Sequence, residues 1–139
     1  MTMTKEATCK ERVRKHYQSR MADLTKLWEL YNEGNDESDE DLGTFNEYGL
    51  CFDYVPKGTF GDQKRGYWRY QLSWGGPSDE FRFYSDETLS IDRIEYWFLD
   101  WFDGAKVNVN GKSLELLTEI WDFFKECGSV EKTMKDAAE

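Results

Sequence analysis

Apolar side chains recur every three or four residues near the start of the chain, which is the spacing that lines one face of an α-helix. Over residues 4–31 this stripe is made by Val13, Tyr17, Met21, Leu24, Trp28 and Tyr31. Gly34 follows and suits the end of a helix, because glycine readily adopts the left-handed conformation found there. A second stripe spans residues 114–127 and is made by Leu114, Leu117, Ile120, Trp121 and Phe124. The sequence therefore predicts a long N-terminal helix and a shorter C-terminal helix.

Between these helices the pattern changes to alternation, which indicates β-strands. The alternating segments lie within residues 47–110, at 47–55, 67–74, 81–85, 91–102 and 105–110. Asp103-Gly104 separates the last two segments and is a strong signal for a tight hairpin turn. Segment 91–102 has large side chains on both faces. This favours a position inside the sheet with both faces covered or, alternatively, one exposed aromatic face.

Short turns between neighbouring strands indicate an antiparallel meander. The predicted fold is therefore α+β, an antiparallel β-meander of about four to five strands with the long N-terminal helix and the C-terminal helix packed on it, in a single domain over residues 1–139. Residues 35–41 carry five carboxylates in seven positions and are predicted to form an acidic loop. The tail, residues 128–139, is either a weak helical turn or disordered.

The charge balance narrows the classes of partner. The chain has 28 acidic against 18 basic residues and a formal net charge of −10. Residues 1–31 carry seven bases and four acids, a net charge of +3, so the rest of the chain carries −13. This balance argues against direct binding to nucleic acid or to an anionic membrane, since both attract basic surfaces. No apolar run reaches the roughly 18 residues of a membrane span, and the polar start lacks the apolar core of a signal peptide, so we expect a cytoplasmic protein.

Candidate catalytic and metal-binding groups are few. The three cysteines are far apart and the chain has a single histidine, His16, so we expect no zinc site and reduced thiols. No nucleophile, phosphate-binding or metalloprotease motif occurs. Asp100 alternates with aromatic residues and is expected to be a polar strand end, or to pair with Arg69 or Arg93 in the sheet. The sequence thus favours a protein that is not an enzyme and needs no cofactor, and a catalytic or metal-binding use of Asp100 is the weaker alternative.

The remaining class of function is recognition of a protein partner through carboxylates or aromatic rings. The acidic candidates lie in the loop 35–41 and in the predicted turns of the sheet. Tyr67 and Tyr84 lie on strand faces opposite the apolar ones, so we expect them to be exposed. The candidate contact residues are Asp36, Glu37, Asp39, Glu40, Asp41, Asp79, Glu80, Asp86, Glu87, Asp103, Tyr67 and Tyr84.

Two segments, QLSWGGPSDEFRFY (71–84) and IEYWFLDWFDGA (94–105), resemble small acidic proteins carried by phages and plasmids. Proteins of that kind are similar in size and charge to the anti-restriction and anti-CRISPR inhibitors of mobile elements. The resemblance implies a partner with a basic surface, such as a nuclease or a CRISPR effector, on which carboxylates would occupy the place of nucleic-acid phosphates. It carries over no catalytic motif and no functional residue.

A second class of function fits the same composition. An intracellular adaptor or small-ligand-binding domain would use an aromatic face of the sheet as its pocket. An enzyme that uses an acidic pair is a third and weaker alternative.

Overall fold

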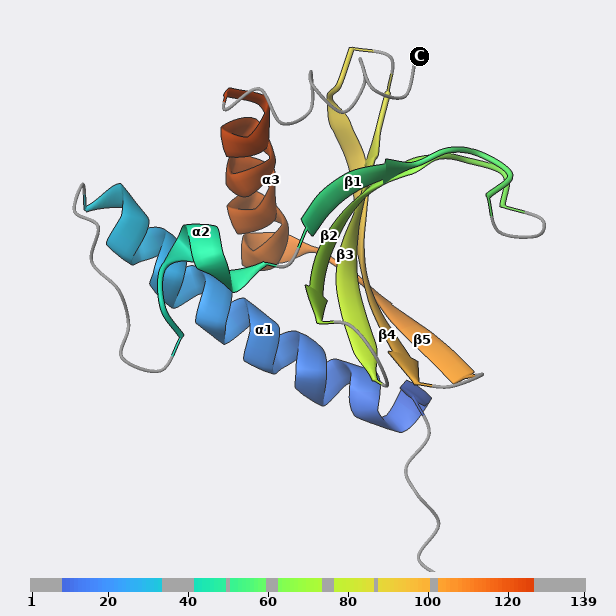
Figure 1. Ribbon diagram of the computed structural model, residues 1–139, viewed down its shortest axis with the longest axis horizontal. Helices are drawn as coiled ribbons and strands as arrows, with labels where there is room; N and C mark the ends of the chain where they lie inside the picture. Colours follow the sequence, from blue (N-terminus) through green and yellow to red (C-terminus); the bar gives the residue numbers. More distant parts are fainter. Residues whose placement is uncertain are drawn as a thin grey trace, which may run out of the picture.

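The computed structural model describes residues 9–33, 42–49, 51–59, 63–73, 77–86, 88–100 and 103–126. The elements, in order, are α1 (Cys9–Asn32), α2 (Phe45–Tyr48), β1 (Cys51–Val55), β2 (Tyr67–Ser73), β3 (Ser78–Ser85), β4 (Ile91–Asp100), β5 (Asp103–Asn108) and α3 (Gly111–Glu126). The five strands lie in the sheet in chain order, and each pairs antiparallel with the next. The predicted α+β fold is confirmed (Figure 1).

The short helix α2 replaces the start of the first predicted strand. Thr44 caps this helix, because its side-chain oxygen accepts a hydrogen bond from the backbone N–H of Glu47. The Glu47 carboxylate accepts the backbone N–H of Thr44 in return, which completes a capping box. Tyr48 therefore ends a helical turn, and the strand begins at Cys51.

Other boundaries also differ from the predicted ones. Asp79 and Glu80 belong to β3 and not to the turn before it, because β3 begins at Ser78. The C-terminal helix begins at Gly111, three residues before the predicted start. The predicted acidic loop 35–41 and the tail 128–139 lie outside the described residues.

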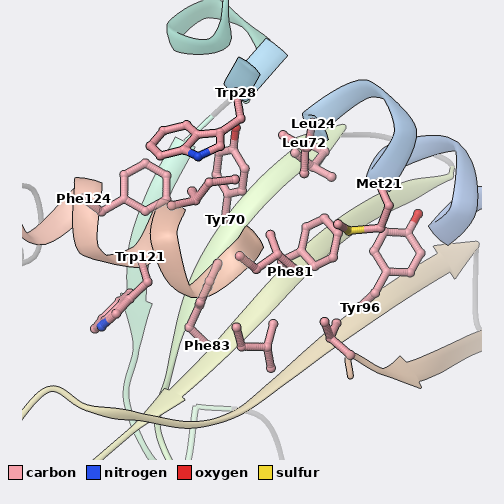
Figure 2. Packing of buried hydrophobic residues seen from close by; sticks show 14 of the residues in the cluster. Met21, Leu24, Trp28, Tyr70, Leu72, Phe81, Phe83, Tyr96, Trp121 and Phe124 are labelled. Carbon is pink, nitrogen blue, oxygen red and sulfur yellow. The ribbon is translucent and has the colours of Figure 1, made fainter. Parts of the chain in front are cut away.

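Helices α1 and α3 pack on one face of the sheet, and the short α2 packs against α1 (Figure 1). The ring centroid of Tyr17 in α1 lies 5.7 Å from that of Tyr96, and the ring of Trp121 in α3 stacks on Phe83 at 5.7 Å. Figure 2 shows how side chains from α1 and α3 interdigitate with those of the central strands. Each fully buried ring of this size contributes about 1.5–3 kcal/mol, so the ring-rich layer accounts for much of the stability.

The opposite face of the sheet has no described helix packed against it. We call it the second face. β4 lies between β3 and β5, as an interior strand should, but only the face that carries Ile94, Tyr96 and Phe98 is covered by described helices. None of the described helices is long and apolar enough to cross a bilayer.

Candidate functional site

The structure describes part of the predicted contact surface. Asp103 and Gly104 belong to β5 and pair with β4, so the predicted Asp103-Gly104 turn is wrong. Asp86 is exposed in the turn before β4. A hydrogen bond from the Thr88 hydroxyl, with a backbone bond from Ser90, holds the pKa of Asp86 below its usual value. Asp86 therefore shapes this turn and stays a charged surface group. The predicted contact residues outside the described ranges are Asp36, Glu37, Asp39, Glu40, Asp41 and Glu87.

Asp79 is buried, with an exposed fraction of 2%, so its predicted place in a surface turn is wrong. Its carboxylate accepts hydrogen bonds from Arg20 of α1, at 2.6 Å from Nε and 3.0 Å from Nη2. The hydroxyl of Tyr96 donates to it at 2.6 Å, and the hydroxyl of Ser73 donates as well. These donors replace water around a carboxylate that would otherwise be too costly to bury. Asp79 thus ties α1 to the sheet and is closed to a partner.

Tyr67 and Glu80 are also buried, each with 2% exposure, because the side chain of Arg82 lies across the second face. The guanidinium carbon of Arg82 is 4.5 Å from the ring centroid of Tyr67 and 4.0 Å from that of Trp97, on the strands that flank β3. Its Nε donates to Glu80 at 2.8 Å. Burial raises the pKa of Tyr67 to about 12. The predicted exposure of Tyr67 and Glu80 is therefore wrong.

Tyr84 belongs to a second cluster on the same face and is 7% exposed, which contradicts its predicted exposure. Its hydroxyl donates to Glu95 at 3.0 Å, and the guanidinium of Arg93 lies 4.3 Å from its ring centroid. Glu95 also accepts from Trp97 Nε1 at 3.0 Å and from Lys106 Nζ at 2.8 Å. Burial raises the pKa of Glu95, but the hydrogen bonds from Lys106, Trp97 and Tyr84 outweigh it and leave the pKa lowered. Aromatic rings and basic side chains therefore cover one another on the second face, where no described helix covers them.

The charged side chains of the second face are consequently paired with one another, so this face is not an anionic surface. Arg69 forms an ion pair with Asp53 at 2.7 Å, as Arg82 does with Glu80 and Lys106 with Glu95. The charged residues of this face include Arg69, Arg82, Arg93, Lys106, Asp53, Glu80 and Glu95. Such a face offers no excess negative charge to a basic partner.

The candidate catalytic groups are occupied by structural contacts. Asp100 pairs with Arg12 of α1 at 2.6 Å, so the expected partners Arg69 and Arg93 are both wrong. The His16 ring stacks on Phe98 with centroids 4.3 Å apart, and burial lowers the pKa of the imidazole. Within the described ranges, no three acidic, histidine or cysteine side chains gather in a way that would hold a metal ion.

Exposed carboxylates gather at the C-terminal ends of α1 and α3. The exposed charges in the N-terminal half of α1 are mainly basic, at Lys10, Arg14 and Lys15, whereas its last turn carries Glu29 and no base. Lys15 and Glu29 are about 21 Å apart along the axis, more than twice the roughly 8 Å over which physiological salt screens exposed charges. The two ends therefore act as separate surfaces. We call the negative one the acidic corner, which consists of Glu29, Glu33, Glu119, Asp122 and Glu126.

Three residues of the acidic corner, Glu119, Asp122 and Glu126, border a hollow of about 310 Å³ between α1 and α3. Its aromatic walls are Trp28, Tyr31 and Phe123. The ring of Tyr31 stacks on Trp28 at 5.5 Å and meets Phe123 edge-on at 5.1 Å. Tyr31 is 39% exposed, and Trp28 Nε1 donates to Glu119 at 3.3 Å. Asn32 and three carboxylates complete the lining, and these three are Glu119, Asp122 and Glu126.

The sequence did not predict this hollow, although the residues that each helix contributes to it follow a recognisable spacing. Glu119, Asp122 and Glu126 are spaced by three and four residues, which places them along one side of a helix. Trp28 and Tyr31 belong to the predicted stripe of α1. What the sequence does not reveal is that the two helices cross so that these sets meet.

Comparisons with protein-family models, with curated proteins and with solved structures found no match.

Proposed function

We propose that this chain is a non-catalytic acidic protein that acts by docking on a basic surface of a protein partner, with the acidic corner as its contact. The observation that carries the proposal is the gathering of Glu29, Glu33, Glu119, Asp122 and Glu126 at one end of the helical layer. Among the described residues, the bases near these carboxylates are Lys26 on α1 and Lys125 on α3, and Lys125 pairs with Asp122 at 3.3 Å. A basic groove is attracted to such a corner by the same field that attracts nucleic acid.

Two arguments support the proposed class of partner: the attraction between an acidic corner and a basic groove, and the resemblance to proteins of mobile elements. A nuclease or CRISPR effector must present lysine and arginine to phosphates spaced about 1.7 Å per charge along duplex DNA. Carboxylates on two packed helices are held at fixed positions and can occupy part of such a groove. The proposed outcome is inhibition of a nucleic-acid-targeting defence system by competition with its nucleic acid.

The second class of function, an adaptor or ligand-binding domain with an aromatic sheet pocket, has less support. The described aromatic residues of the sheet either pack under α1 and α3 or lie beneath the arginines of the second face.

The test measures DNA cleavage by purified restriction nucleases and guide-loaded CRISPR effectors with the chain added at several salt concentrations. Inhibition should weaken as salt rises, because the acidic corner is exposed and its field is screened. D122K/E126K should lose inhibition by about tenfold or more. The matched control, E11K/E115K, changes the net charge equally but lies outside the corner and should keep it. Salt-insensitive inhibition, an equal loss in both variants, or no binding to any such protein at low salt would contradict the proposal.

A further inference from the structure

The hollow in the acidic corner combines two chemistries that favour one kind of ligand. The faces of aromatic rings attract cations, and so do carboxylates. Here Trp28, Tyr31 and Phe123 stand beside Glu119, Asp122 and Glu126 in one concave space. None of the residues that line it is basic. An anion would be repelled, and a neutral apolar group would strip water from the carboxylates without compensating them.

The helix ends add to this preference. Asn32 and Glu126 are the last residues of α1 and α3, and both line the hollow. The C-terminal end of a helix carries a partial negative charge from its unpaired carbonyl groups. The last residue of each helix borders the hollow, so the backbone adds to the attraction that the side chains exert on a cation.

The chain itself shows which cation suits this arrangement. Elsewhere in the fold a guanidinium lies over a ring while it bonds to a carboxylate. Arg82 does so with Trp97 and Glu80, where its guanidinium carbon is 4.0 Å from the ring centroid and its Nε is 2.8 Å from the carboxylate. Arg20 does so with Tyr48 and Asp79, and Arg93 with Tyr84 and Glu95. The hollow presents the same rings and carboxylates, and its lining contains no guanidinium.

We infer that the hollow receives one arginine side chain of the basic partner. This inference rests on the proposed function and specifies the chemistry of its central contact. Arginine fits better than lysine, because a guanidinium is flat, weakly hydrated and able to stack on a ring while it donates several hydrogen bonds to carboxylates. Tyr31, exposed at the rim, forms the stacking wall, and Glu126 and Glu119 accept the hydrogen bonds.

The test uses short peptides of glycine and serine with one central residue, either arginine, lysine or citrulline, added to the full chain. Binding is followed by NMR through the indole N–H signal of Trp28. The arginine peptide should give a saturable shift, and the lysine peptide should bind about threefold or more weakly. The citrulline peptide, which has the same shape without the charge, should give no shift. Equal binding of citrulline, or stronger binding of lysine, would overturn the inference.

Matched variants locate the contact. Y31A should weaken arginine binding by about fivefold or more, and E126Q should weaken it too. The control E115Q changes an exposed glutamate of the same helix outside the hollow and should bind as the unchanged chain does. Y31A removes an exposed side chain, and a preserved amide spectrum shows that the fold is intact. A Y31A variant that binds arginine normally would overturn the inference.

Two further results separate the inference from the proposed function. If Y31A no longer binds the arginine peptide but still inhibits its partner fully, the inference fails and the docking proposal stands. If D122K/E126K inhibits normally while arginine binds in the hollow of the unchanged chain, docking through the corner fails instead. Concentration-dependent dimers that D122K/E126K abolishes would assign the hollow to a second copy, and would overturn the inference of a partner's arginine.

Discussion

Replacing Asp79 by asparagine should destabilise the fold strongly, because it leaves a positive charge without its partner. The change keeps the size of the side chain and removes the charge that faces Arg20. Breaking a buried ion pair from one side costs about 3–5 kcal/mol. The side chain of Arg20 keeps 25% exposure and still donates to the Tyr48 hydroxyl at 2.8 Å, so water and Tyr48 offset part of this cost. We therefore expect a loss of about 2–3 kcal/mol.

This loss can be measured by urea unfolding at neutral pH, followed by tryptophan fluorescence. A total stability of about 5–15 kcal/mol is usual for a chain of this size, so the midpoint should fall visibly. The control Y96F removes a single hydrogen bond to the same carboxylate and should cost about 1–2 kcal/mol. The size of the two losses distinguishes the missing charge from a missing bond.

A double-mutant cycle tests the cause. If the cost of D79N comes from the stranded Arg20, the double variant R20M/D79N should lose less stability than the two single losses summed, by about 1 kcal/mol or more. Strict additivity, or a loss in D79N below about 0.5 kcal/mol, would show that Arg20 and Asp79 do not stabilise one another as their contacts indicate.

Two other changes probe the sheet. The variant G49A should lose about 1–3 kcal/mol of stability in thermal or urea unfolding. The reason is that an added Cβ would lie 2.1 Å from Cε1 of the buried Tyr70. A G49A variant as stable as the unchanged chain would refute this close approach. Because the pKa of Glu95 is lowered in the folded state, its carboxylate adds stability above its ordinary value of 4.5, and this is lost as the pH falls through the folded value. The urea midpoint should therefore fall more steeply on acidification below pH 4.5 in the unchanged chain than in E95Q, and parallel curves would contradict this.

The fold was predictable because two periodicities divide the chain cleanly. The stripe of α1 and the stripe of α3 are each longer than three turns, and the strands between them alternate and are joined by short turns. Helix α2 was missed because four residues are too few to show a helical stripe. Its signal is instead the Thr44–Glu47 capping box, which is local and readable in the sequence.

The alternation of apolar and polar residues along the strands did not predict which polar side chains would be buried. Tyr67 and Tyr84 lie on the side of the sheet opposite the helices, as the pattern indicates, yet arginines from neighbouring strands cover them. Which arginine covers which ring depends on strand register. Arg12 and Asp100 are 88 residues apart and meet only because α1 crosses the end of β4. Pairings of this kind require the tertiary structure.

The position of the acidic corner also argues that its charges do more than keep the chain dispersed. Helix C-terminal ends favour cations, and an acidic side chain there is unfavourable by about 0.3–1 kcal/mol. α1 nevertheless has no basic residue in its last turn and carries Glu29 there, whereas α3 ends on Glu126 with Lys125 beside it. Exposed carboxylates on a strand edge or a helix N-terminus would give the same net charge without this cost. A cation bound between the two helix ends would relieve this repulsion, in agreement with the proposed docking on a basic partner.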